Sequence, residues 1–302
     1  MKIKILFFTL LFFTVFCLKG YSQSNKDKFS QAFSNGDTTT QIKILADWKK
    51  VTPDDPDYYV SAFNYYAKRG LTEVLSLSTI KPSSDAFELK DKTNKTVGYL
   101  GSSPSFNEKF IKEGFMCIDS AIAKFPTRLD MRFGKVYVLG RVFDYDRFTQ
   151  EIILAIDYGQ TIKNKWLWRD GKPLDDAEKF IASTIQSYIN QLFQAGDTQT
   201  GNMRLISQEV LKYYPDNVEN LSDLSITYMI DKQYDKALSL LLRAEKIAPQ
   251  DYIVLNNIGY CYELQKDKVN AIKYYELVKK YGSDDAKQDA SKKIENLNKK
   301  NK

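Results

Sequence analysis

Residues 218–251 read VENLSDLSITYMIDKQYDKALSLLLRAEKIAPQD, and residues 252–285 read YIVLNNIGYCYELQKDKVNAIKYYELVKKYGSDD. The second segment follows the first directly and aligns with it along its whole length, which gives a period of about 34 residues. Matching positions carry similar or small side chains, and the pairs are Leu221 with Leu255, Leu224 with Ile258, Ser225 with Gly259, Tyr228 with Tyr262, Ala237 with Ala271, Leu241 with Tyr275, Ala244 with Val278 and Pro249 with Ser283. This recurrence predicts an internal structural repeat.

Each segment has the pattern of two short helices. Leu221, Leu224 and Tyr228 recur at helical spacing and form one apolar stripe. Ser225 is small at a position where two helices of a hairpin approach closely. Pro249 ends the second helix, because the residue before a proline is poorly suited to helix. Helices of this length are marginal in isolation, so we expect the hairpins to stack on one another.

The period and these residue types resemble the tetratricopeptide repeat (TPR), in which each unit is a helix, a turn and a second helix. The resemblance implies an all-α fold, a right-handed α-solenoid of TPR-like helical hairpins. It also implies a scaffold that binds a partner. The strong match covers only about a quarter of the chain.

Weaker forms of the pattern extend upstream. The segment LKYYP at 211–215 ends a helix with Pro215, which stands one period before Pro249. The sequence predicts the following organisation: a degenerate helical repeat region at 23–70, a β-rich insertion at 71–104, degenerate TPR-like helices at 105–214, two well-matched repeats at 215–283, and a C-terminal capping helix with a lysine-rich tail at 284–302.

Two segments interrupt the helical pattern. Residues 71–104 are rich in Gly, Pro, Ser and Thr, and the segment 91–95 is typical of a hairpin turn, so we expect a small β-hairpin that serves as a spacer or as a recognition loop. The second is the tryptophan turn, residues 164–174. Trp166 and Trp168 either stack on a ligand or fill space between hairpins, and packing is the more common role of large aromatic side chains.

The first residues resemble a secretory signal peptide at 1–22. Lys2 and Lys4 precede an apolar run from 5 to 18, followed by small residues. The run is short for a membrane span, although an uncleaved anchor remains an alternative. Cys17 would suggest a lipoprotein, but the preceding Phe16 does not fit that signal. We therefore expect export to the periplasm or the exterior, and the style of the sequence is similar to exported repeat proteins common in Bacteroidota.

Composition argues against catalysis. The chain has no histidine, which removes the commonest general base and metal ligand. Cys117 and Cys261 have no CxxC partner, so neither a zinc cluster nor a redox pair is indicated. The 44 basic and 38 acidic side chains give no footprint for nucleic acid. We predict no catalytic residue, cofactor or metal.

The resemblance to TPR proteins implies a binding groove lined by the first helix of each repeat. Residues there that hairpin packing does not require are Ile226, Met229, Asn256, Asn257, Tyr260 and Glu263. Among them only Asn257 resembles a residue of the basic carboxylate clamp of some relatives. A hydrophobic or extended peptide therefore fits better than a C-terminal carboxylate.

These observations predict a non-catalytic exported scaffold that binds a partner protein or peptide in the cell envelope, with no transmembrane segment after signal cleavage. One alternative is glycan binding through Trp166, Trp168 and the β insertion. Another is a divergent hydrolase, which would use acid pairs such as 54–55, 175–176 or 284–285. Helix capping is the more ordinary role for such pairs.

Overall fold

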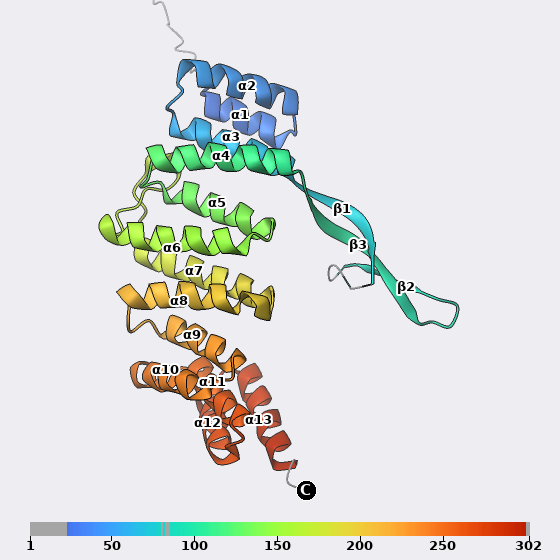
Figure 1. The fold of residues 1–302 in the computed structure, drawn as a ribbon, viewed down its shortest axis with the longest axis vertical. Coiled ribbons are helices and arrows are strands. Elements are labelled where there is room, and N and C mark those ends of the chain that lie inside the picture. The colour runs from blue at the N-terminus through green and yellow to red at the C-terminus, as the bar shows by residue number, and fades with distance from the viewer. Residues whose placement is uncertain (1–22, 80, 82–84, 300–302) are drawn as a thin grey trace, which may run out of the picture. The chain divides into compact units, whose positions relative to one another are not determined.

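The computed structural model describes residues 23–79, 81 and 85–299 as antiparallel helices with one β insertion (Figure 1). The predicted signal at 1–22 lies outside the described residues. The described part of the chain forms two compact units, with the boundary between Ser61 and Ala62. The boundary falls within helix α3 (Pro56–Gly70). The predicted all-α, TPR-like fold with a small β insertion is confirmed.

The first unit is a helical hairpin followed by the start of α3. Its helices are α1 (Asn25–Ser34) and α2 (Thr38–Val51), and the side chain of Asp37 caps α2 by accepting a hydrogen bond from the N–H of Thr40 at 3.0 Å. Trp48 is only 2% exposed and donates its indole N–H to Asp55 at 2.9 Å. The unit thus has a small core of its own.

The second unit contains the remaining helices of the described chain. They are α4 (Glu108–Lys124), α5 (Leu129–Arg141), α6 (Tyr145–Thr161), α7 (Ala177–Gln194), α8 (Thr200–Tyr213), α9 (Val218–Ile230), α10 (Tyr234–Ile247), α11 (Tyr252–Leu264), α12 (Lys268–Tyr281) and α13 (Asp284–Lys299). Helices α9 and α11 begin one sequence period apart, as do α8, α10 and α12. The period of the sequence is therefore the period of the structure in this region.

The turns inside successive hairpins share their geometry. Lys232 and Lys266 both have positive φ angles, 61° and 63°. After the first, the N–H of Gln233 donates to the carbonyl of Tyr228 at 2.8 Å, and the equivalent bond of the next repeat measures 2.9 Å. A left-handed residue at this point allows the last carbonyls of the first helix to be satisfied.

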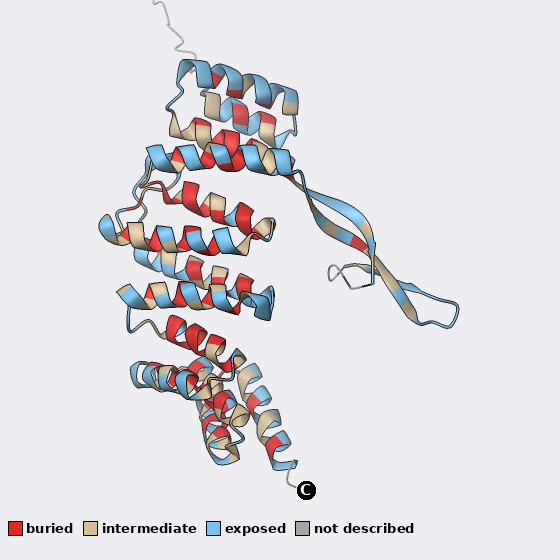
Figure 2. Cartoon of the chain, in the orientation of Figure 1, coloured by how far each residue is buried: buried red, intermediate tan, exposed pale blue. Residues whose placement is uncertain are grey.

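The close approach of α11 and α12 explains the small residue at 259. A β-carbon at Gly259 would lie 2.8 Å from ring carbons of Tyr275. The preceding repeat has Ser225 and Leu241 at these positions. The larger ring of Tyr275 is thus matched by a smaller neighbour, as close packing requires. Figure 2 shows the resulting pattern, with buried residues repeated along the inner faces of the helices.

The insertion has three strands, whereas the sequence predicted only a hairpin. Strands β1 (Leu71–Ser78), β2 (Phe87–Lys90) and β3 (Thr96–Phe106) form an antiparallel sheet in the order β1-β3-β2. Strand β3 runs two residues beyond the predicted end. The predicted turn joins β2 to β3, and Asp91 stabilises it by accepting hydrogen bonds from the backbone N–H groups of Thr93 and Lys95.

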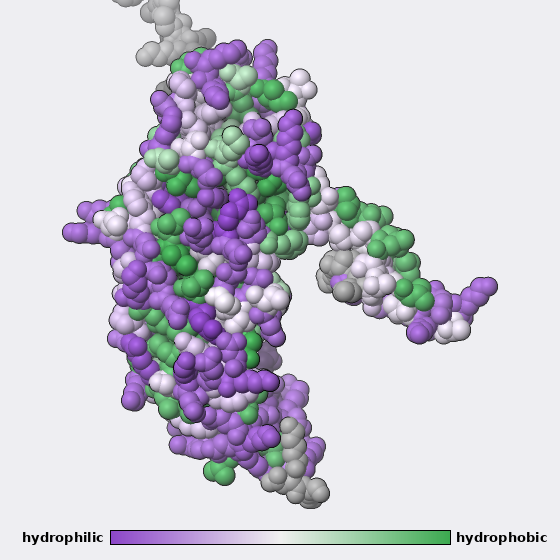
Figure 3. Space-filling view, in the orientation of Figure 1, coloured by the Kyte–Doolittle hydropathy of each residue, from purple (hydrophilic) through white to green (hydrophobic). Residues whose placement is uncertain are grey.

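One face of the sheet is apolar and exposed. The strand register places Leu77, Leu100 and Phe87 side by side, with Leu75 and Leu89 on the same face. Leu75, Leu77 and Phe87 are 73%, 72% and 73% exposed. Figure 3 shows apolar side chains along one border of the insertion and hydrophilic ones at its far end. The sheet therefore has too little cover to form a core of its own.

The insertion leaves and rejoins the helices at one point. Leu71 pairs with Phe106, and the N–H of Asn107 donates to the carbonyl of Gly70 at 2.9 Å. The side chain of Asn107 then caps α4 by accepting from the N–H of Phe110. The insertion is thus closed at its base, and beyond it Glu73 of β1 pairs with Arg141 of α5 at 3.9 Å.

Replacing residues 72–105 by a short Gly-Ser turn is expected to leave the helical stack intact. The free energy of unfolding should change by less than about 1 kcal/mol, or about 2–4 °C in melting temperature. As a control, Gly70→Leu in the full chain should destabilise it, because an added β-carbon would lie 2.9 Å from Cγ1 of Ile111. A large loss of helical circular dichroism after excision would contradict this modularity.

Candidate functional site

The tryptophan turn packs against helices of the second unit. Trp166 is 1% exposed and belongs to a cluster with Leu129, Phe133 and Ala155. Trp168 is half-buried, with its ring centroid 4.9 Å from that of Phe180. The two rings therefore fill space between helices. Trp166 cannot reach a partner without unpacking, and we leave it out of the candidate site; the glycan-stacking alternative loses its principal residue.

The predicted groove residues on α9 are mostly internal. Met229 is 6% exposed and lies in the core of the last two repeats, and Ile226 is half-buried against the same core. Both side chains are needed for packing, contrary to the assumption on which they were selected. The stripe facing the neighbouring helix is wider than the sequence suggests.

The predicted residues on α11 are more accessible, although three have partners within the chain. Asn257 donates to the hydroxyl of Ser222 at 2.8 Å, and Asn256 accepts from Lys293 at 2.9 Å. Glu263 accepts from the hydroxyl of Tyr275 at 3.0 Å. Tyr260 is 44% exposed. Within this predicted set, Tyr260 presents the largest accessible ring.

Side-chain hydrogen bonds join successive first helices. Gln186 of α7 donates to Asp223 of α9 at 3.3 Å, and the contacts just described join α9 to α11 and α11 to α13. We call the exposed side of these helices, α7, α9, α11 and α13, the first-helix surface. It is polar where neighbouring helices meet and carries Tyr260 between those contacts.

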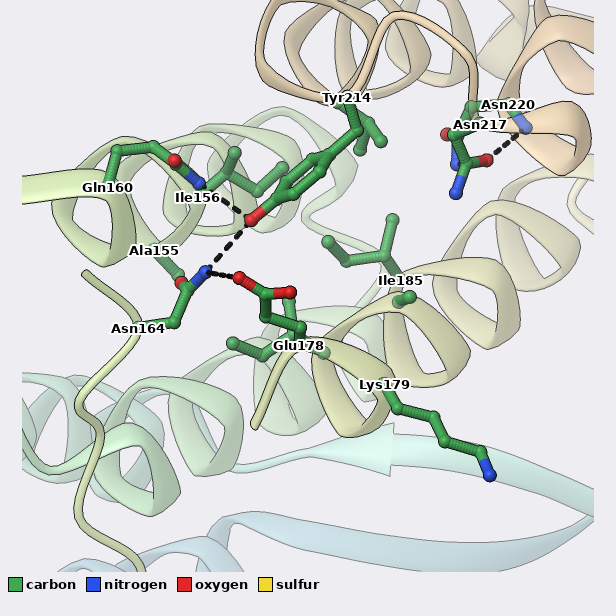
Figure 4. A pocket seen from close by; sticks show the side chains of 13 residues that line it. Ala155, Ile156, Gln160, Asn164, Glu178, Lys179, Ile185, Tyr214, Asn217 and Asn220 are labelled. Atoms are coloured by element: carbon green, nitrogen blue, oxygen red, sulfur yellow. Dashed lines mark hydrogen bonds between the residues drawn. The ribbon is translucent and has the colours of Figure 1, made fainter. Parts of the chain in front are cut away.

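A pocket with a volume of about 240 Å³ lies between α6, α7, α8 and the start of α9 (Figure 4). Its floor is apolar and comes from α6, α7 and α8, and its members are Ala155, Ile156, Ile181, Ile185 and Val210. Its polar members come from five segments and are Gln160, Asn164, Glu178, Lys179, Tyr214, Asn217 and Asn220. An apolar cavity of about 150 Å³ can hold benzene, so this larger one has room for a single large side chain.

A hydrogen-bond network fixes one wall of the pocket. The hydroxyl of Tyr214 accepts from Gln160 at 3.0 Å and from Asn164 at 2.9 Å. Asn164 also donates to Glu178 at 3.1 Å. Figure 4 shows these side chains converging, while Lys179 points away. Since Asn164 begins the tryptophan turn, packing of that turn positions one wall of the pocket.

Three buried oxygen acceptors on α7 and α9 lack donors among the described residues, and of the residues that carry them only Asn220 lines the pocket. Asn220 is 3% exposed; its Nδ2 donates to Asn217 at 2.9 Å, but its Oδ1 has no partner among the described residues. Oδ2 of Asp223 and Oε1 of Gln186 are also buried and unpartnered in the described chain. We call these three oxygens the acceptor cluster. Each unmet buried acceptor costs about 1–3 kcal/mol, so such a grouping points to function.

Burial also changes the ionisation of Asp223. The side chain is 7% exposed, and burial raises its pKa to about 7, with the nearby Glu219 adding to the shift and the hydrogen bond from Gln186 opposing it. Asp223 does not line the pocket, so the raised pKa marks an unusual buried carboxyl group on α9 rather than a group of the pocket itself.

The described residues offer little support for a paired-acid site, a metal site or a disulfide. The acid pair at 54–55 is engaged through Asp55, which accepts from Trp48 and from the N–H of Asp57. In the described part of the chain no group of three or more Cys or acidic side chains is placed to hold a metal, and no helix there is long and apolar enough to cross a membrane. Cys117 is half-buried and Cys261 buried, and neither forms a disulfide.

The pocket residues were not predicted from the sequence. The period of the repeats would start the first helix of the preceding unit at 184, but α7 starts at Ala177 and so brings Glu178, Ile181 and Ile185 beside α6. One signal was available: Asn220 and Asp223 stand next to the buried Leu221 and Leu224. Polar residues that border an apolar stripe this closely are candidates for burial.

The helices described above define a repeat protein built from TPR-like helical hairpins. In sequence comparison, neither a family model nor a curated protein matches the chain. Among solved structures, it is similar to the C-terminal part of a TPR repeat-containing protein from Cytophaga hutchinsonii, with 15% identity, coverage of 84% of this chain and 77% of that one, and a TM-score of 0.41.

Two further solved structures show the same kind of likeness. A tetratricopeptide repeat protein from Parabacteroides merdae is 10% identical over 86% of this chain and 79% of that one, with a TM-score of 0.37. The TPR domain of P58(IPK) is 13% identical, with coverage of 92% of this chain and 66% of that one and a TM-score of 0.30. The description of the fold rests on the helices of this chain itself.

Proposed function

We propose that this chain is a non-catalytic, exported scaffold that binds a partner protein or peptide in the cell envelope through the first-helix surface. The observation that carries the proposal is the pocket between α6, α7, α8 and α9, with an apolar floor and one wall fixed by hydrogen bonds to Tyr214. Export is supported by the sequence of residues 1–22. The partner enters as an extended segment, with one side chain in the pocket.

The dimensions of the site support a peptide. About 240 Å³ is small beside the 300–1,000 Å³ of drug-sized ligand pockets, but it suits one anchoring side chain. The first-helix surface continues from the pocket along α9, α11 and α13, where Tyr260 is exposed. Recognition of one buried anchor with weaker contacts beside it is common at protein interfaces.

Position-specific photo-crosslinking in intact cells tests this function. A benzophenone side chain is placed at Ala182, which is exposed and lines the pocket, at Tyr260, and at Val269 of the second helix α12, which is 78% exposed. The first two positions should give an adduct with the same partner, and Val269 should not. Equal adducts from all three positions, or none from Ala182 and Tyr260, would refute the proposed surface.

A further inference from the structure

We propose that the pocket selects a carboxamide side chain, glutamine or asparagine, of the bound partner. The inference rests on the proposed function and adds a ligand chemistry to it. The juxtaposition that carries it is an apolar floor beside two polar side chains, Gln160 and Tyr214, which together present one hydrogen-bond donor and one acceptor. Both side chains line the pocket and are only half-buried, so a group bound there can reach them.

The hydroxyl of Tyr214 has a proton to donate and no acceptor for it among the described residues. Its oxygen already accepts from Nε2 of Gln160 at 3.0 Å and from Nδ2 of Asn164 at 2.9 Å. The orientation of the Asn164 amide is fixed, because its Nδ2 also donates to the carboxylate of Glu178, which only accepts. Two accepted bonds use the capacity of the hydroxyl oxygen, so the O–H group of Tyr214 remains as a donor.

Gln160 supplies the complementary acceptor. Its Nε2 is bonded to Tyr214, and the Oε1 of the same amide has no donor among the described residues. Turning this amide over exchanges the roles without changing the sum: Tyr214 then donates to Oε1, and Nε2 becomes the free donor beside a hydroxyl oxygen with one open acceptor site. In either orientation, one donor and one acceptor lie side by side in the wall of the pocket.

A primary carboxamide matches this pair of groups. Its carbonyl oxygen accepts a hydrogen bond and its NH2 group donates one. A carboxylate offers only acceptors, and an ammonium or guanidinium group offers only donors, so each would leave one member of the pair without a partner, which weakens binding. Glu178 also lines the pocket and disfavours a second carboxylate by its charge.

The apolar floor suits the methylene stem that carries a carboxamide. Ile156, Ile185 and Val210 are all buried and line the pocket. A wholly apolar side chain would cover this floor but would leave the donor and the acceptor of the wall unpaired. Asn220 lines the pocket too, but its Oδ1 is buried, so the acceptor cluster takes no part in this recognition. The only basic side chain of the lining, Lys179, points away from the other side chains (Figure 4).

Matched peptides test this inference on the full mature chain. The probes are acetyl-Leu-Gln-Leu-N-methylamide, which has no other primary carboxamide, and the same peptide with glutamate in place of glutamine, which keeps the shape and replaces the NH2 group by a second acceptor. Titration calorimetry should give saturable binding of the glutamine peptide and at least about tenfold weaker binding of the glutamate peptide. Equal affinities, or no saturable binding of the glutamine peptide, would overturn the proposal.

Tyr214→Phe assigns the selectivity to the pair, with a third peptide that has methionine at the centre. The variant keeps the ring and removes the hydroxyl, so the ratio of the glutamine affinity to the methionine affinity should fall about fivefold, the value of one hydrogen bond. Comparing this ratio between the two proteins cancels the difference in apolar burial between the peptides. Tyr213→Phe is the matched control and should leave the ratio unchanged, because the hydroxyl of Tyr213 donates to Asp157 at 2.7 Å and Tyr213 does not line the pocket.

The outcomes separate this inference from the function on which it rests. An unchanged ratio in a folded Tyr214→Phe variant would refute the role of the pair, and the glutamine and glutamate peptides decide the proposal on the unaltered chain even if that variant does not fold. If crosslinks at Ala182 persist while these two peptides bind equally, the scaffold function stands and the carboxamide selectivity fails; if those crosslinks are absent, the scaffold function fails.

Discussion

Replacing Trp166 by alanine is expected to lower the free energy of unfolding by about 3–5 kcal/mol, the range for truncating a large buried aromatic side chain. The ring is 1% exposed and packs beside Leu129 and Phe133, and the guanidinium of Arg132 lies 5.9 Å from its centroid. Urea denaturation followed by circular dichroism measures the change. An unchanged midpoint would contradict the structural role of this ring.

Two matched variants separate packing from other effects. Trp166→Phe keeps most of the apolar contact and removes an indole N–H that has no acceptor among the described residues, so it should cost less than alanine. Trp168→Ala should also cost less, because this ring is only half-buried. Equal losses of unfolding free energy from Trp166→Ala and Trp168→Ala would argue that the degree of burial does not determine how much each ring stabilises the fold.

Asp223→Asn is expected to stabilise the chain above neutral pH and to alter its pH dependence. The folded pKa of Asp223 is about 7, against ~3.9 for an unfolded aspartate. Between these values the folded state binds more protons than the unfolded state, so wild-type stability falls as the pH rises from about 4 to about 7. The full shift corresponds to an upper limit of about 4 kcal/mol.

Denaturation of both proteins at pH 5 and pH 8 measures this effect. The difference between variant and wild type cancels titrations elsewhere in the chain, provided that they are distant from Asp223. The variant should gain on the wild type as the pH rises and should be the more stable at pH 8. A constant difference would show that Asp223 keeps an ordinary pKa and does not carry the cost of burial.

The repeat region could be predicted from the sequence because local and tertiary requirements coincide there. Leu221, Ser225 and Ala237 have the residue types that packing within a hairpin requires. Their counterparts one period later are of the same apolar or small types. The structure adds only that the small Gly259 makes room for the large ring of Tyr275. When local preferences and tertiary packing agree in this way, the fold can be predicted from the sequence.

The pocket could not be predicted from the sequence because it depends on departures from the repeat period. Its shape follows from the early start of α7 and from the packing of the tryptophan turn, and neither obeys the period. The first strand was missed for a related reason: Leu71–Ser78 pairs with a partner near residue 100, so its stabilisation is not local. The burial of Asn220 and Asp223 likewise depends on tertiary packing, which a short window of sequence does not encode.

The closure of the β insertion at Gly70 and Asn107 separates the chain into parts with different evolutionary freedom. Ile111 leaves no room for a side chain at Gly70, and Asn107 both hydrogen-bonds to Gly70 and caps α4. The residue types at these two positions are therefore constrained by the packing of the helices. The residues of the strands beyond them are constrained chiefly by pairing within the sheet. Substitutions in the insertion can therefore change its exposed surface while the packing of the helical repeats is preserved.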